Sequence, residues 1–246
     1  MAGRFEGKVA LVIGGSSGIG LATVRGLLAG GGRVTIAARD EARLRSVGEE
    51  LLAEHPERVA WVAGDVGELG EAERFVGVTV ERFARLDVLV TSSARNYTSR
   101  IVEAAEEDVA AVLRTNALGP LLAARAAARA FGPEGGRIVT LSATAARRGR
   151  PGRSVYAASK GAVEAFTRVL AVELAPRQIT VNAVAPGLTN TPMLGNRGGP
   201  GRAADIPMGR IGEPEEVAAA VLWLASAEAA ACNGQTIVLD GGGIQA

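Results

Sequence analysis

The sequence predicts an α/β protein, a single doubly wound domain in which a seven-stranded parallel sheet carries helices on both faces. Two observations support this prediction. Short apolar runs alternate with longer segments of helical periodicity along the whole chain. These runs are rich in Val and Ile instead of alternating with polar residues, which is typical of strands buried on both faces of a parallel sheet. Together they predict a Rossmann-type arrangement, whose ligands bind outside the carboxyl ends of the strands.

The first strand is expected over Lys8–Ile13, an apolar run that ends in glycines. A glycine-rich turn leads from it into a helix over Gly18–Ala29, and a second strand follows over Arg33–Ala38. The next helix, Asp40–Glu54, is highly charged, and its first residue is a good helix cap. A third apolar run predicts a strand over Arg58–Ala63.

The middle of the chain repeats this alternation. We expect a helix over Glu68–Ala84, a strand over Asp87–Thr91 and, after a loop, a long Ala-rich helix over about Val109–Phe131. A fifth strand is expected over Arg137–Ser142. The helix after it runs from Ser154 to about Glu173.

The last third of the chain completes the sheet. Strands are expected over Ile179–Val184 and Thr236–Asp240, with a helix over Glu215–Ser226 between them. The segment 189–212 is rich in Gly and Pro, which predicts a flexible flap over a binding site. No repeat, linker or second domain is visible, so residues 1–246 are expected to form one domain.

The composition excludes several classes of function. A formal net charge of +1 gives no general attraction to nucleic acid or to an anionic membrane surface. The only cysteine, Cys232, has no partner for an internal disulfide, which indicates a reducing compartment and argues against a metal site. Because His55 is the only histidine, a Ser-His-Asp mechanism is not expected. With no signal peptide or membrane span visible, we expect a cytoplasmic protein.

A glycine-rich turn follows the first predicted strand, with the sequence Gly14-Gly15-Ser16-Ser17-Gly18-Ile19-Gly20. Glycines let the backbone approach a pyrophosphate, and the N-terminus of the next helix supplies amides and partial positive charge. The spacing differs from the common Gly-x-Gly-x-x-Gly fingerprint. The turn therefore predicts a dinucleotide site, and a tight turn without a ligand is the alternative.

Tyr156 and Lys160 are four residues apart and share one face of their predicted helix. A neighbouring ammonium favours the phenolate and lowers the pKa of a tyrosine from its usual value of about 10. Of 27 basic residues only Lys8 and Lys160 are lysine, and arginine is a poor substitute at a chemical site. The pair predicts a proton donor, and a surface pair that arose by chance is the alternative.

Several motifs occur together in a fixed order, namely Gly14-x-x-x-Gly18-x-Gly20, Asp65, Asn116, Tyr156-x-x-x-Lys160 and Pro186-Gly187. With these motifs the sequence resembles the short-chain dehydrogenase/reductase family, and in particular its 3-oxoacyl-[acyl-carrier-protein] reductase-like branch. The resemblance covers nearly the whole chain, down to Asp240-Gly241-Gly242. It implies a nicotinamide cofactor, reduction of a ketone to a secondary alcohol or the reverse, and a homotetramer.

The resemblance also implies a role for each motif residue. Tyr156 exchanges a proton with the substrate oxygen, while Lys160 holds the nicotinamide ribose and lowers the pKa of that tyrosine. Asn116 positions a water molecule in a proton relay, and a polar residue that kinks the helix is the alternative. Asp65 accepts from the adenine amino group, although a helix cap would look similar. The other expected cofactor contacts are Gly14, Ser16, Ser17, Gly18, Ile19, Gly20, Val66, Ser93, Ala94, Pro186, Gly187, Thr189 and Thr191.

Arg39 follows the second predicted strand and favours NADP(H) over NAD(H). An acidic residue at this place normally binds the ribose 2′-hydroxyl, whereas an arginine accommodates a 2′-phosphate. Ala38 occupies the usually acidic position. Asp40 is the alternative ribose ligand, unless it caps the following helix.

The sequence departs from the family pattern at its turn, at its fourth strand and at its catalytic serine. Ile13 replaces a threonine, and Thr91-Ser92-Ser93-Ala94 replaces Asn-Asn-Ala-Gly. Ala143 stands where the family has a serine that donates to the reacting carbonyl oxygen, and losing such a donor costs ~10²–10³ in rate. Ser142 and Thr144 should point away from the direction of Ala143, because side chains alternate along a strand, unless a bend brings Thr144 back.

Several functions remain open at this point. The protein is a slow reductase, an NADP-binding protein that lost catalysis, or an engineered serine-to-alanine variant of an active reductase. A related lyase, isomerase or enoyl reductase is a further alternative. The loop before the Tyr156 helix suggests an anionic or carrier-bound acyl thioester as substrate, and a solvated loop is the alternative. That loop contains Arg147, Arg148, Arg150 and Arg153.

Overall fold

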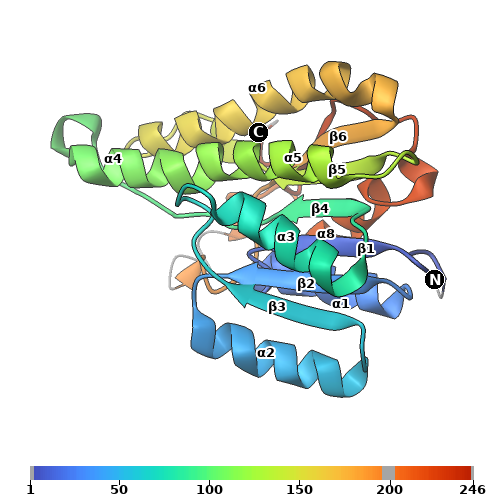
Figure 1. Ribbon diagram of the computed structural model, residues 1–246. Coiled ribbons are helices and arrows are strands. Elements are labelled where there is room, and N and C mark those ends of the chain that lie inside the picture. The colour runs from blue at the N-terminus through green and yellow to red at the C-terminus, as the bar shows by residue number, and fades with distance from the viewer. Residues whose placement is uncertain (1–2, 196–202, 245–246) are drawn as a thin grey trace.

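The computed structural model describes residues 3–195 and 203–244, and within them the chain forms a seven-stranded sheet (Figure 1). The strand order is β3-β2-β1-β4-β5-β6-β7, and every neighbouring pair is parallel. This confirms the predicted fold class. The order reverses direction between β1 and β4, which creates the crevice where such sheets bind ligands. The strands are β1 (Val9–Ile13), β2 (Arg33–Ala38), β3 (Val59–Ala63), β4 (Val88–Thr91), β5 (Gly136–Leu141), β6 (Ile179–Pro186) and β7 (Thr236–Leu239).

Helices cover both faces of the sheet (Figure 1). Successive residues of a strand point to opposite faces, so Val12 packs beneath α1, α2 and α8, and Ile13 packs beneath α3, α5 and α6. This explains why the strands are apolar without alternation. The helices are α1 (Gly18–Ala29), α2 (Glu41–Glu54), α3 (Glu71–Phe83), α4 (Glu106–Leu113), α5 (Gly119–Ala130), α6 (Ser154–Leu174) and α8 (Pro214–Leu224).

The helix predicted to begin at Glu68 begins three residues later, as α3. Its N-cap is Gly70, whose φ of 88° lies in the left-handed region and ends any earlier helical turn. The carboxylate of Asp65 accepts from the backbone N–H of Gly67 at 2.9 Å. Asp65 therefore closes a local turn and does not cap α3.

The long Ala-rich helix predicted over Val109–Phe131 is also different in the structure. It starts earlier, at Glu106, and a π-helical turn over Arg114–Leu118 separates α4 from α5. Single π-helical turns inside α-helices often occur at functional sites. This turn contains Asn116, which is fully buried.

The segment predicted as a flap is tied together at its two ends. Thr189 and Gly212 form an isolated bridge, and the N–H of Asn190 donates to the carbonyl of Gly212 at 2.8 Å. Part of the predicted flap, residues 196–202, lies outside the described residues.

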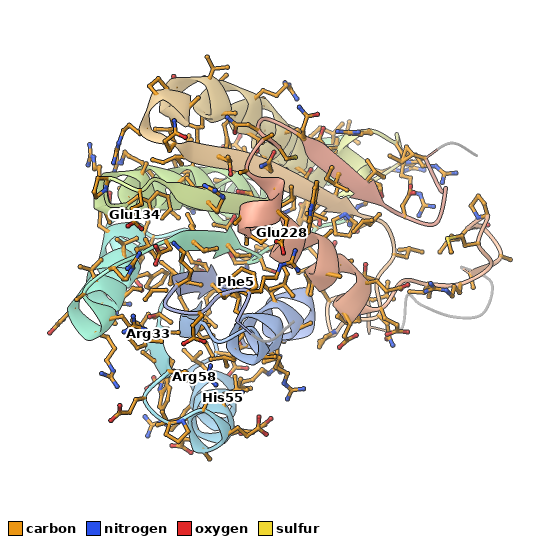
Figure 2. All side chains as sticks on the ribbon, turned by 90° about the vertical axis from the view of Figure 1, so that its right-hand side faces the viewer. Phe5, Arg33, His55, Arg58, Glu134 and Glu228 are labelled. Atoms are coloured by element: carbon orange, nitrogen blue, oxygen red, sulfur yellow. The ribbon has the colours of Figure 1, made fainter. Side chains whose placement is uncertain are left out.

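The edge of the sheet where the strands begin faces the viewer in Figure 2. Arg33 is the first residue of β2, and Glu134 precedes β5. Arg58, next to β3, donates to the carbonyl of Leu28 at 2.9 Å and contacts the ring of His55. These labelled side chains lie at the edge opposite the carboxyl ends of the strands.

Candidate active site

A cavity of about 940 Å³ lies at the carboxyl ends of the strands. Every residue predicted for the site lines it, apart from Gly20 and Asn116. Segments far apart in sequence therefore meet around one space. The predicted residues in its lining are Gly14, Ser16, Ser17, Gly18, Ile19, Arg39, Asp65, Val66, Ser93, Ala94, Ser142, Ala143, Tyr156, Lys160, Pro186, Gly187, Thr189 and Thr191.

The glycine-rich turn packs tightly against the end of β4. Gly14 has a φ of +84°, and a Cβ at this position would lie 2.5 Å from the backbone nitrogen of Ser93. Gly20 does not line the cavity, because it closes the turn, and a Cβ there would lie 2.1 Å from the carbonyl oxygen of Gly14. Only glycine permits these two approaches.

The N-terminus of α1 opens into the cavity. Ser17 is its N-cap residue, and its side chain makes no capping hydrogen bond. Within the described residues, the buried hydroxyl of Ser93 also has no hydrogen-bond partner. Free helix amides beside an unpaired buried hydroxyl fit an anionic ligand with acceptor oxygens. The residues present therefore fit the pyrophosphate of a dinucleotide.

Two arginines and two aspartates lie at the end of the cavity near β2. The Arg39 guanidinium is 3.6 Å from the carboxylate of Asp65. Asp40 accepts from the backbone N–H of Arg43 at 3.1 Å and so caps α2, which occupies the side chain that could otherwise bind a ribose hydroxyl. Arg43, which sequence analysis missed, lines the cavity from the first turn of α2 and lies 3.6 Å from the carboxylate of Asp40. The pair of arginines makes this end suitable for a phosphate group.

Lys160 is almost completely buried, with 2% of its surface exposed. Its Nζ donates to the carbonyl oxygen of Leu141, at the end of β5, at 2.7 Å. Burial lowers the pKa of this amine from 10.5 to about 8, because a low-dielectric environment disfavours the charged form. The burial of Lys160 thus brings the pKa of its amine closer to physiological pH than that of an exposed lysine.

Tyr156 lies one turn before Lys160 on α6, with 8% of its surface exposed. The Nζ of Lys160 is 5.9 Å from the centroid of the phenol ring. The guanidinium of Arg153 lies closer, at 4.1 Å from the same centroid. The ring therefore faces two cations within the cavity.

The hydroxyl groups of Ser142 and Thr144, on either side of Ala143, differ in their hydrogen bonds. The Ser142 hydroxyl lies within 3.2 Å of the carbonyl of Lys160 and 3.1 Å of the carboxylate of Glu164, so it bonds toward α6. The Thr144 side chain borders the cavity, and its hydroxyl has no hydrogen-bond partner among the described residues. Of the two flanking hydroxyls, Thr144 is the one available to a ligand.

Asn116 lies behind the cavity wall. Its Oδ1 accepts from the backbone N–H of Arg95 at 2.6 Å, and its Nδ2 donates to the Arg95 carbonyl at 3.0 Å and to the Ser159 hydroxyl at 3.1 Å. Ser159 donates in turn to the carbonyl of Tyr156 at 2.7 Å. The Asn116 side chain thereby fixes the segment after β4 against α6.

The four arginines of the loop before α6 have separate environments. Arg147 forms an ion pair with Glu164 at 3.0 Å and does not line the cavity. Arg148, which does, donates to the carbonyl of Gly243 at 2.6 Å. Arg150 is exposed at the cavity rim, and its side chain has no hydrogen-bond or ion-pair partner among the described residues. Arg153 also lines the cavity and bonds to residues 96–98.

Sequence analysis also missed Thr98 in the cavity lining. It lies on an irregular segment whose course no periodicity reveals. Within residues 3–195 and 203–244, no group of three or more His, Cys, Asp or Glu side chains is arranged to hold a metal ion. In the same part of the chain, no helix has the length and apolar character of a membrane span.

Comparisons with known proteins show which family this chain resembles. The matching family model is described as enoyl-(acyl carrier protein) reductase and covers residues 13–243. The chain is 37% identical over 238 residues to the 3-oxoacyl-[acyl-carrier-protein] reductase of Synechocystis sp., with 96% of each chain covered. It is 38% identical over 248 residues to the 2,3-dihydroxy-2,3-dihydro-p-cumate dehydrogenase of Pseudomonas putida, covering 96% of this chain and 94% of the relative.

A solved structure has the same fold over its full length. The short-chain dehydrogenase of Burkholderia cenocepacia in complex with NADP superposes with a TM-score of 0.93 at 33% identity, covering 99% of this chain and 100% of that one. The matching family model, the full-length relatives and the parallel sheet show that this chain belongs to the short-chain dehydrogenase/reductase family of oxidoreductases.

Proposed function

We propose that the protein is an NADPH-dependent oxidoreductase that reduces a ketone to a secondary alcohol, or catalyses the reverse reaction. One observation carries this proposal. Tyr156 and the buried Lys160 share one face of α6 inside the cavity that the glycine-rich turn also lines. A proton donor therefore lies in the same space as a site suited to a dinucleotide.

The cofactor is held along the carboxyl edge of the sheet. Its pyrophosphate binds at Gly14, Ser16–Gly18 and the N-terminus of α1. Arg39 and Arg43 bind the 2′-phosphate, and Asp65 accepts from the adenine amino group. The other contacts are with Ile19, Val66, Ser93, Ala94, Pro186, Gly187, Thr189 and Thr191. When bound, the nicotinamide supplies the hydride, or accepts it in the reverse direction.

Tyr156 donates the proton to the carbonyl oxygen during reduction and accepts it during alcohol oxidation. Lys160 holds the nicotinamide ribose and favours the phenolate through its charge. The Oδ1 and Nδ2 atoms of Asn116 are already engaged with Arg95 and Ser159. In our proposal the backbone of the π-helical turn that contains Asn116 therefore binds the water molecule of the proton relay. Ala143 leaves the carbonyl oxygen without the hydroxyl donor of the family pattern, which makes the reaction slow.

The substrate that fits this cavity best is an anionic carbonyl compound such as a 3-oxoacyl thioester. Arg148 and Arg150 border the cavity without a carboxylate partner among the described residues, so they attract negative charge. The name of the Synechocystis relative, 3-oxoacyl-[acyl-carrier-protein] reductase, supports the same substrate class. An enoyl thioester is the second candidate substrate, because the matching family model is described as enoyl-(acyl carrier protein) reductase.

We also propose a cytoplasmic homotetramer that assembles through α4–α5 and α6. Exposed apolar side chains on α6 support such an interface, since Val169 and Val172 are 54% and 77% exposed. Leu113 and Leu121, on α4 and α5, are partly exposed as well.

Oxidation of NADPH by a panel of carbonyl compounds tests the proposed activity. We expect turnover of 3-oxoacyl thioesters with NADPH and less with NADH, and we expect turnover of charged substrates to fall as ionic strength rises. Neutral ketones of similar size are the matched control for the salt effect. If an enoyl thioester is reduced while every ketone is left unchanged, the enzyme is an enoyl reductase instead. If NADPH binds without turnover of any substrate, the protein is better described as a cofactor-binding protein.

Replacing Arg39 with alanine tests the cofactor preference. The Kd for NADPH is expected to rise by about 10–10²-fold, because a charge-assisted hydrogen bond is worth about 1.5–3 kcal/mol. The Kd for NADH should stay nearly unchanged. Arg45 is the matched control, because it is an exposed arginine of α2 that pairs with Glu41 and does not line the cavity. Equal losses for both cofactors would contradict a 2′-phosphate contact.

A further inference from the structure

Arg153 is the last residue before α6 and lies over the face of the Tyr156 ring. At 4.1 Å from the ring centroid, its guanidinium is in direct contact with the aromatic face. Planar guanidinium groups stack on aromatic rings in this way, and the ring face attracts the positive charge. Lys160, at 5.9 Å, is the more distant of these two cations.

The same guanidinium also binds the segment that follows β4. Its Nη1 donates to the side chain of Asn96 at 2.6 Å, to the carbonyl of Tyr97 at 2.8 Å and to the hydroxyl of Thr98 at 3.0 Å. All three acceptors are uncharged oxygen atoms, and these bonds fix the position of the Arg153 guanidinium.

A second set of contacts holds this segment in place. The N–H of Ser99 donates to the carbonyl of Gly152 at 3.0 Å. Gly152 has a φ of +77°, and a Cβ there would lie 3.3 Å from Thr98, so the turn before α6 packs closely on the segment. Farther back, Asn116 holds both backbone groups of Arg95. The segment after β4 is thus held at Arg95 and at Ser99, and Arg153 links it to the Tyr156 ring.

We propose that Arg153 is a positioning residue that holds the Tyr156 ring and the 96–98 segment as one unit and stabilises the phenolate form of Tyr156. The inference rests on the proposed role of Tyr156 as the acid–base group. In this inference Arg153 is a second cation, beside Lys160, that favours the phenolate of Tyr156. The segment after β4 contributes by holding Arg153 in place.

The other charged groups around the cavity come from several elements. Among the described residues, Lys160 is the second cation over the Tyr156 ring, and it belongs to α6. Arg148 and Arg150, from the loop before α6, and Asp205 and Asp240, from the C-terminal part of the chain, line the same cavity. Both carboxylate oxygens of Asp240 accept backbone N–H groups, of Gly242 and Ile244.

A direct titration tests the inference without any enzyme assay. The chain has two tyrosines, so in a Tyr97→Phe background Tyr156 is the only source of the ultraviolet tyrosinate signal. Arg153→Gln removes the charge but keeps a hydrogen-bond donor. We expect it to raise the titration midpoint of Tyr156 by about one pH unit, the size of a charge interaction over a few ångströms at a partly solvated site. Arg150→Gln is the matched control and should leave the midpoint in place.

Arg153→Lys is the second variant. It keeps the charge but loses the planar contact, so its midpoint should lie between those of the Tyr97→Phe protein and its Arg153→Gln derivative. Circular dichroism checks that each variant is folded. An unchanged midpoint in Arg153→Gln, or an equal rise in Arg150→Gln, overturns the inference.

The pH profile of alcohol oxidation separates this inference from the proposed function. If the enzyme is active, the pH of half-maximal kcat should rise in Arg153→Gln by the same amount as the tyrosinate midpoint. A shifted titration in a protein that oxidises no alcohol would contradict the proposed function and leave the positioning role supported. Activity with identical profiles in the parent and the variant would contradict the positioning role alone.

Discussion

Replacing Lys160 with methionine is expected to remove most of the turnover and, at the same time, to stabilise the folded chain. We expect the activity loss because, in our proposal, the charge of Lys160 favours the phenolate of Tyr156. A general acid–base group contributes about 10²–10⁴-fold to the rate. Methionine is unbranched and flexible, so it fills the space of the buried lysine stem without a charge. Steady-state kinetics with the best substrate measures the loss.

The gain in stability follows from the cost of burying the ammonium. The pKa of Lys160 falls from 10.5 to about 8 on folding, which corresponds to roughly 3 kcal/mol at about 1.4 kcal/mol per unit. The lost hydrogen bond to the Leu141 carbonyl offsets about 1 kcal/mol of this. We therefore expect the free energy of unfolding to rise by about 2 kcal/mol near pH 7, or the Tm by about 4–8 °C.

The pH dependence of this difference has a defined sign. Between pH 8 and pH 10.5 the unfolded chain binds more protons at Lys160 than the folded chain, so the stability contribution of this group rises with pH over that window. The advantage of the methionine variant should be complete below pH 8 and vanish as the pH approaches 10.5. Chemical denaturation at several pH values measures it.

Lys8 is the control for this experiment, because it is the only other lysine. Its side chain is 46% exposed and lies 3.6 Å from the carboxylate of Asp87. Lys8→Met should leave turnover unchanged and should not stabilise the protein. A Lys160→Met protein that is less stable at every pH would mean that the buried amine is compensated by contacts beyond the Leu141 carbonyl.

Replacing Ala143 with serine is expected to raise kcat by about 10²–10³-fold, the usual value of one donor to a reacting carbonyl oxygen. Ala143 has φ −165° and ψ 154°, an extended conformation that any residue adopts, so serine introduces no backbone strain. The position lines the cavity and is half-buried, which leaves the new hydroxyl facing the substrate space. Kinetics of the two proteins with one ketone and NADPH measures the gain.

Two further variants locate the donor. Ala143→Cys introduces a group of similar size but a weaker donor, so it should give a smaller gain than serine. Thr144→Val removes the neighbouring hydroxyl, which has no partner among the described residues. If Ala143→Ser brings no gain while Thr144→Val lowers kcat, Thr144 already serves the carbonyl oxygen and the site is complete as it stands.

Several site features could be predicted because they depend on local sequence. Gly14 and Gly20 mark a turn that only glycine can form, and the four-residue spacing of Tyr156 and Lys160 places both on one helical face. The Val- and Ile-rich runs determined the parallel sheet. Once the sheet was known, its carboxyl edge had to carry the site.

Other features could not be predicted, because they depend on contacts between segments distant in sequence. The burial of Lys160 behind the end of β5 sets its pKa, and no local pattern reveals that burial. The side-chain bonds of Ser142 and Asn116 likewise join elements that sequence spacing does not relate.

The sequence by itself determined the fold class, the glycine-rich turn and the shared helical face of Tyr156 and Lys160, since each is a matter of periodicity, glycine geometry or helical spacing. Only the tertiary structure decided which arginines face the cavity. Arg147 turns to Glu164 while Arg153 stacks on Tyr156, although both belong to one short loop. The physical reason is that a guanidinium on a flexible stem takes its position from the partners that folding brings within reach.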